Sequence, residues 1–187
     1  SSAGIDSKYY VWDPLLPGSS GLGFGGYQLL SSANLWMPVP GNTMNYVSGV
    51  PYSKIQSGQA FFVYSTPGGT VDFNETNKIV GNQMVYRHDP PAGSGFLRTL
   101  LFGESGMIVD GNVLAVDDHF ATGFNADDAI KILNSGENFG IFNKERMLSL
   151  DARNKVDDGD TLFYSFNGLR TQTYHVNITP DNFESAT

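Results

Sequence analysis

The chain has 187 residues and a formal net charge of −8, and it contains few charged residues, many glycines and aromatics, and no cysteine. Its length is sufficient to bury a hydrophobic core. The negative charge argues against binding of nucleic acid or an anionic membrane, and no apolar run is long enough for membrane insertion. The lack of cysteine excludes disulfides and thiolate metal sites.

Short runs rich in aromatic and β-branched residues recur along the chain and predict β-strands. In chain order the runs are 9–12, 27–31, 59–65, 70–74, 96–102, 113–116, 147–151, 161–166 and 173–178. Three turn-forming groups lie between runs, namely Asp110-Gly111-Asn112, Asp158-Gly159 and Asn167-Gly168. One short helix is predicted at 126–134, although its apolar residues fit a short strand almost as well. We therefore predict an all-β fold, a two-layer antiparallel β-sandwich of jelly-roll or immunoglobulin-like type, with very little helix.

The most aromatic run is Ala60-Phe61-Phe62-Val63-Tyr64, which Pro67-Gly68-Gly69 follows. This order predicts a hairpin with a return strand at 70–74. Since both faces of the first strand are apolar, we expect a central strand with neither face open to water. The residues expected to be deeply buried are Phe61, Val63, Leu100, Val116, Leu150, Phe163 and Val176.

The stretch 89–95 is rich in proline and glycine and is the best internal boundary. We expect one β-sandwich module over 1–187. The alternative is two lobes, 1–92 and 96–187, divided at this loop.

Two patterns that suggest catalysis or cofactor binding have simpler explanations. Residues 21–26 match the dinucleotide fingerprint G-x-G-x-x-G, but a proline precedes them and a strand follows where a helix is required. His88, His119 and His175 are far apart, and none belongs to a zinc or nucleophile motif. These observations favour a glycine-rich loop and surface histidines.

Pairs of acidic residues in the predicted loops are a candidate calcium site. Ca²⁺ binds clustered oxygen ligands, and Asp110, Asp117 and Asp127 are the first candidates for a structural ion. The alternative is that these residues serve as turn and cap residues. No other cofactor is expected.

The loop 34–52 carries three aromatic residues, Trp36, Tyr46 and Tyr52, together with Asn42. Exposed rings stack on sugars, and amides hydrogen-bond to hydroxyls, so this loop is a candidate site for a neutral polysaccharide. The alternative is that the rings fold inward and seal the core, as large rings usually do.

Several segments resemble a region of large secreted Bacteroidetes proteins. These segments are "YYVWDP", "GGYQLL", "IQSGQAFFVYST", "GGTVDFNETNK", "FLRTLLF", "ATGFNADDAIKI", "LSLDAR" and "GLRTQTYHV", and they extend over roughly 9–180. In those proteins the region usually precedes the C-terminal sorting domain for type IX secretion. The resemblance implies a β-rich module at the bacterial surface or outside the cell, and it supplies no catalytic residues. It also implies that Thr161, in Asp160-Thr161-Leu162, is an O-glycan acceptor.

Three functions follow from these patterns. We expect a non-catalytic extracellular module that acts as a spacer, stalk or assembly unit, with neighbouring domains of a larger precursor or like subunits as its partners. The first alternative is a glycan-binding module, and the second is an enzyme.

Overall fold

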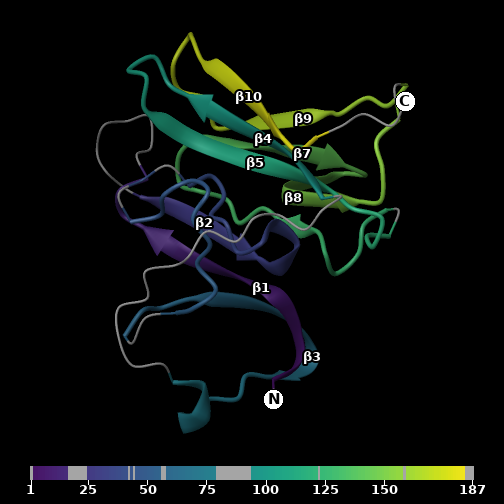
Figure 1. Ribbon diagram of the computed structural model, residues 1–187. Helices are drawn as coiled ribbons and strands as arrows, with labels where there is room; N and C mark the ends of the chain where they lie inside the picture. Colours follow the sequence, from purple (N-terminus) through teal and green to yellow (C-terminus); the bar gives the residue numbers. More distant parts are fainter. Residues whose placement is uncertain are drawn as a thin grey trace.

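The computed structural model describes residues 2–16, 25–41, 43, 45–55, 58–78, 94–121, 123–157 and 159–183. Within these ranges the chain forms ten β-strands in two sheets, with two single-turn 3-10 helices, η1 (Ser32–Asn34) and η2 (Glu75–Asn77). The prediction of an all-β, sandwich-like fold is therefore confirmed (Figure 1).

The smaller sheet consists of β1 (Ala3–Asp13), β2 (Gly26–Ser31) and β3 (Phe62–Thr70), in the order β2-β1-β3 with both pairs antiparallel. The larger sheet has the order β10-β4-β5-β8-β7-β9, and β6 pairs with β8 beside this path. Its strands are β4 (Gly95–Phe102), β5 (Ile108–Val116), β6 (Ala129–Ile130), β7 (Asn138–Asn143), β8 (Arg146–Arg153), β9 (Tyr164–Asn167) and β10 (His175–Asp181). Strands β5 and β8 are parallel, so the larger sheet is mixed.

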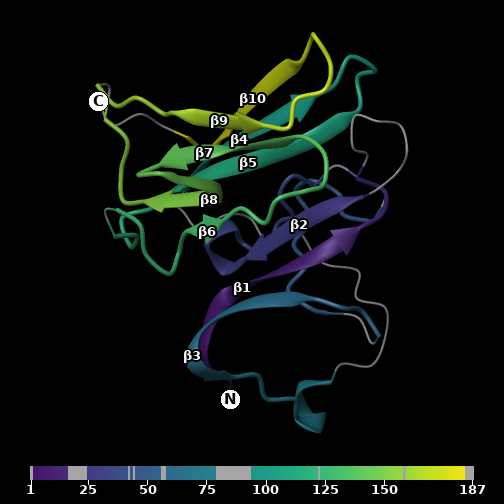
Figure 2. The ribbon, with the colours of Figure 1, turned by 180° about the vertical axis from the view of Figure 1, so that it is seen from behind.

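The two sheets pack against each other through an apolar core. Tyr10 and Leu29 of the smaller sheet contact the same cluster as Phe96, Val113 and Leu150 of the larger sheet. The Tyr10 hydroxyl also donates to the carbonyl of Ile130 at 2.7 Å. Figure 2 shows β6 on the side of the larger sheet that faces β1 and β2. The core thus combines residues from both sides of the proline-rich stretch 89–95.

The larger sheet curls around a second apolar core. The Phe139 ring of β7 stacks on Tyr164 and Phe166 of β9, with centroids 5.3 and 4.7 Å apart. The Tyr164 hydroxyl lies 3.1 Å from the Thr99 hydroxyl of β4, although three strands separate β9 from β4 in the sheet order. This contact is possible because the sheet bends until β9 faces β4.

The predicted hairpin around Pro67-Gly68-Gly69 is wrong. These residues lie inside β3, which continues to Thr70 and pairs with β1 through two register shifts. Strand β3 is an edge strand, and Phe62 and Tyr64 are 54% and 55% exposed. The apolar sequence correctly predicts a strand, but it does not reveal that only one neighbour lies beside it.

Two further local predictions are wrong. The segment 126–134 forms a turn and β6, so the predicted helix is wrong and the alternative of a short strand holds for Ala129–Ile130. The buried Asp128 carboxylate binds the N–H groups of Asn125 and Ala152 there. The predicted turn at 110–112 lies inside β5. A Cβ on Gly111 would lie 2.9 Å from Pro40, in the loop after Val39, so this glycine permits close packing and does not form a turn.

The predicted core residues have three outcomes. Leu150 is fully buried, as expected, and four residues are half-buried, namely Phe61, Val63, Leu100 and Val116. Phe163 and Val176 are 62% and 46% exposed, so their predicted burial is wrong. Leu162 and Tyr164 both pack inward, so the alternation along the chain turns Phe163 outward. Val176 lies on β10, an edge strand of the sheet.

Candidate functional site

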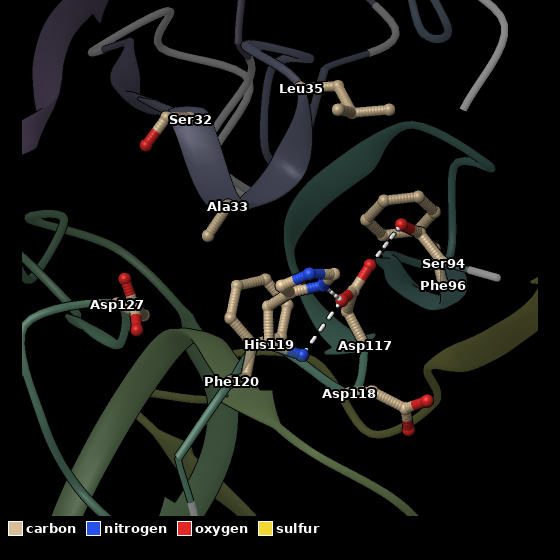
Figure 3. A pocket seen from close by; sticks show the side chains of 10 residues that line it. All are labelled: Ser32, Ala33, Leu35, Ser94, Phe96, Asp117, Asp118, His119, Phe120 and Asp127. Atoms are coloured by element: carbon tan, nitrogen blue, oxygen red, sulfur yellow. Dashed lines mark hydrogen bonds and ion pairs between the residues drawn. The ribbon is translucent and has the colours of Figure 1, made fainter. Parts of the chain in front are cut away.

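A cavity with a volume of about 430 Å³ lies between the two sheets (Figure 3). Its polar lining residues are Ser32, Ser94, Asp117, Asp118, His119 and Asp127, and its apolar ones are Ala33, Leu35, Phe96 and Phe120. One wall is the η1 turn, which follows β2. The opposite wall is the turn at 117–120, which follows β5 and is closed by the Phe120 N–H donating to the Asp117 carbonyl at 2.9 Å.

Asp117 is the polar centre of this cavity. Its carboxylate accepts hydrogen bonds from the Ser94 hydroxyl at 2.5 Å, from the His119 backbone N–H at 2.9 Å and from the His119 ring Nδ1 at 2.6 Å. The bond from Ser94, followed by those from His119, lowers the pKa of Asp117 below its usual value. In turn, the hydrogen bond to Asp117 and the charge of that carboxylate raise the pKa of His119. The pair is therefore charged over a wider range of pH than either group would be alone.

The cavity contains a serine, an aspartate and a histidine, but their connection differs from that of a nucleophilic triad. In a triad the imidazole lies between the hydroxyl and the carboxylate and removes the hydroxyl proton. Here the carboxylate lies between Ser94 and His119, and the His119 side chain is 93% exposed. The arrangement gives the serine no imidazole base. Its carboxylates can instead accept hydroxyl or N–H groups of a bound molecule.

The predicted calcium ligands do not all come together. Asp117 and Asp127 line the same cavity, whereas Asp110 is fully buried inside β5. Asp110 accepts hydrogen bonds from Lys131 Nζ at 2.7 Å, from Phe139 N at 2.7 Å and from Gly111 N at 2.8 Å. Across the described ranges, no group of three or more histidine or acidic side chains is placed to hold a metal ion.

The predicted sugar-binding rings do come together, but they pack on β1. Tyr46 is buried, and Trp36 and Tyr52 pack with it against Tyr9 on the outer face of the smaller sheet. The Trp36 and Tyr9 centroids are 5.9 Å apart, and those of Tyr46 and Tyr52 are 5.1 Å apart. This is the arrangement of a loop that seals a core. Asn42 lies outside the described residues.

Aromatic rings are exposed elsewhere on the smaller sheet. Trp12 meets Tyr27 at an interplanar angle of 78°, and Tyr27 meets Phe62 at 80°. Trp12 and Phe62 are 41% and 54% exposed. Because neighbouring rings stand edge to face, they do not form the coplanar platform on which a chain of sugar rings stacks.

Asp13 is an organising residue that the sequence analysis missed. It is fully buried, and its carboxylate accepts hydrogen bonds from the Gln28 amide at 3.0 Å and the Thr43 hydroxyl at 2.6 Å. The Asn45 amide also donates to it, at 3.3 Å. Asp13 therefore attaches the aromatic loop to the smaller sheet. An acidic residue inside an aromatic strand is the signal that could have found it.

The outer edge of β10 is the most accessible part of either sheet. All seven residues of β10 are exposed, and in the described part of the chain no strand pairs with its outer side. All seven pair with β4 without a register shift. Val176 and Ile178 face the same side of the sheet as the buried Leu101 and Thr99, yet they are 46% and 53% exposed.

The other sheet edges are less suited to pairing. The backbone of Leu29 in β2 is already bonded to Val39, β3 is irregular, and β9 has four residues. Strand β10 is thus the longest regular open edge among the described strands. Figure 1 shows it at the top of the molecule, on the side opposite β3.

Three further predicted positions lie at the surface. Thr161 is exposed, as modification of its hydroxyl would require. His119 and His175 are exposed, while His88 and residues 21–24 lie outside the described ranges. No helix that is long and apolar enough to cross a bilayer occurs in the described chain.

Comparison with known proteins returns no match, whether to a family model, to a curated protein or to a solved structure.

Proposed function

We propose that this chain is a non-catalytic β-sandwich module of a secreted or cell-surface protein, and that it acts there as an assembly unit or spacer. The observation that supports this role is the open edge of β10. It combines seven exposed residues, a regular register with β4 and half-exposed apolar side chains. Such an edge pairs readily with a strand of another domain or subunit.

The internal polar groups also support a structural role. The buried carboxylates Asp13, Asp110 and Asp128 all bind backbone or side-chain donors of the chain itself. They connect loops to strands and strands to each other. Their hydrogen-bonding capacity is used for the fold.

Sedimentation velocity across a wide range of protein concentration tests the proposal. We expect concentration-dependent association of the purified chain, and we expect the substitution Ile178→Lys to abolish it by placing a charge on the pairing edge. Tyr64→Lys is the matched control, since Tyr64 is 55% exposed on the edge strand β3 and Ile178 is 53% exposed on β10. Association that survives Ile178→Lys, or a wild-type chain that stays monomeric throughout, contradicts assembly through β10.

A second candidate function, binding of a neutral glycan, is favoured by the cavity between the sheets. It offers the Phe96 and Phe120 rings beside the carboxylates of Asp117 and Asp127, and sugars bind through such combinations of rings and hydrogen-bond acceptors. Affinity gels with neutral glycans test this function. Loss of retardation with Phe120→Ala indicates the cavity, and loss with Trp36→Ala indicates the loop. Wild-type protein that is not retarded by any glycan contradicts both.

A further inference from the structure

We propose that the partner of β10 is a second copy of the same chain, whose β10 pairs antiparallel about a twofold axis at Ile178. This inference rests on the proposed assembly function and specifies its partner and register. It follows from the orientation of the backbone of β10, the alternation of its side chains and the charges at its two ends.

Pro180 indicates which backbone groups face outward. Proline has no N–H, so it fits an edge strand where its nitrogen points away from the paired neighbour. Backbone groups of an antiparallel strand alternate between its two sides, so Val176 and Ile178 share the outward direction of Pro180. The free edge therefore presents the N–H and C=O groups of Val176 and Ile178, and the C=O group of Pro180.

An antiparallel copy centred on Ile178 matches these groups. Each Ile178 N–H reaches the carbonyl of the partner's Ile178, and each Val176 N–H reaches the carbonyl of the partner's Pro180. On the face that carries Val176, Ile178 and Pro180, the same register places apolar side chains opposite apolar ones. The exposed parts of Val176 and Ile178 would then be covered by their own equivalents.

The side chains at the two ends of β10 favour this register when His175 is protonated. The strand begins at His175 and ends at Asp181, and both side chains lie with Asn177 and Thr179 on the face where Phe96 of β4 packs against the smaller sheet. Pairing about Ile178 places His175 opposite the partner's Asp181, and the twofold axis repeats the contact at the other end. Opposite charges directly across a strand pair are stabilising, and like charges are destabilising. A register shifted by two residues on one strand would instead place His175 opposite the partner's Thr179.

The contact is one strand wide, so it belongs to the small, transient class of interfaces. The net charge of −8 on each copy opposes association at low ionic strength. Association is therefore expected to require high protein concentration and to be measured at physiological salt, where the repulsion is screened.

Single-cysteine crosslinking tests the register directly, because the chain has no native cysteine. Under mild oxidation Ile178→Cys is expected to give a disulfide-linked dimer, since residues on the twofold axis lie within disulfide reach. Tyr64→Cys is the matched control, with nearly the same exposure on the other edge strand, and it is expected to stay monomeric. A charge exchange provides the second arm. His175→Asp should weaken association, and His175→Asp combined with Asp181→His should restore it.

The outcomes separate the register from the proposed function. Crosslinking at position 178 with rescue by the double exchange supports the inference. If the chain associates and Ile178→Lys abolishes this, but position 178 crosslinks no better than position 64, the twofold register is overturned and assembly through β10 stands. Association only with an added foreign peptide strand also overturns the second copy as partner. A wild-type chain that remains monomeric overturns the inference together with self-assembly through β10.

Discussion

The buried pair of Asp110 and Lys131 allows a quantitative prediction. Asp110 is fully buried, the Lys131 side chain is 4% exposed, and Nζ lies 2.7 Å from the carboxylate. The substitution Lys131→Met retains most of the side-chain volume but leaves an uncompensated carboxylate in the core. Removal of one partner of such a pair costs about 3–5 kcal/mol. We expect this loss in the free energy of unfolding, measured by urea denaturation near neutral pH.

The pH dependence of that loss has a defined sign. Burial raises the pKa of Asp110, and the Lys131 ammonium group and the backbone N–H groups oppose this rise. Without Lys131 the pKa should rise further, so the folded state binds a proton more strongly than the unfolded state. The folded state is then stabilised as pH falls through the raised pKa, and the loss should be smaller at about pH 5 than at about pH 8.

A surface ion pair provides the control for this experiment. Lys155 lies 3.0 Å from Asp157, and the two side chains are 61% and 54% exposed. Exposed pairs contribute about 0–1 kcal/mol, so Lys155→Met should have little effect at either pH. If Lys131→Met costs no more than Lys155→Met, or if its cost grows as pH falls, the argument for an uncompensated buried carboxylate is refuted.

Asn112 is 1% exposed, and within the described structure neither its side-chain nitrogen nor its side-chain oxygen has a hydrogen-bond partner. Asn112→Leu should therefore raise the free energy of unfolding by about 1–3 kcal/mol. A variant less stable than the wild type would contradict this. NMR titration should place the pKa of His119 above 6.5, and Asp117→Asn should lower it; an unchanged midpoint would show that the pair does not form in solution. Leu150 is buried and Phe163 is exposed, so in urea unfolding Leu150→Ala should cost about 2–5 kcal/mol and Phe163→Ala less than about 0.5 kcal/mol. Similar costs for the two variants would contradict this difference in burial.

Much of the strand content could be predicted from local sequence, because aromatic and β-branched runs favour extended backbone in any sheet. The runs at 27–31, 96–102 and 147–151 correspond to β2, β4 and β8. Strand β7 was missed because its glycine and asparagines suggest a turn. Gly140 is required there for packing, since a Cβ would lie 2.7 Å from the Leu148 carbonyl oxygen.

Position within a sheet was harder to predict than the strands themselves. The same apolar run describes a central strand and an edge strand, and the difference depends on partners that are distant in sequence. Phe62 and Val176 are exposed for this reason.

The candidate cavity was predicted only in part. Asp117 and Asp127 were selected as oxygen ligands, but Ser94 and Phe120 had no local signal. They reach Asp117 only because β4 and β5 are paired and the chain turns back after β5. Packing between separate strands creates this site, so local sequence patterns do not contain it.

The pairing of β10 with β4 has a consequence for how the chain reaches its native state. His175 lies beside Phe102 and Asp181 beside Phe96, so the last described strand completes its ladder with residues from the middle of the chain. The entropy of closing that long loop must be lost before any of these hydrogen bonds form, which makes such topologies slow to fold. During synthesis the edge of β4 that pairs with β10 therefore remains unpaired until β10 has been translated. Slow translation or early termination within β10 would leave the backbone and apolar residues of β4 exposed to other unfinished chains.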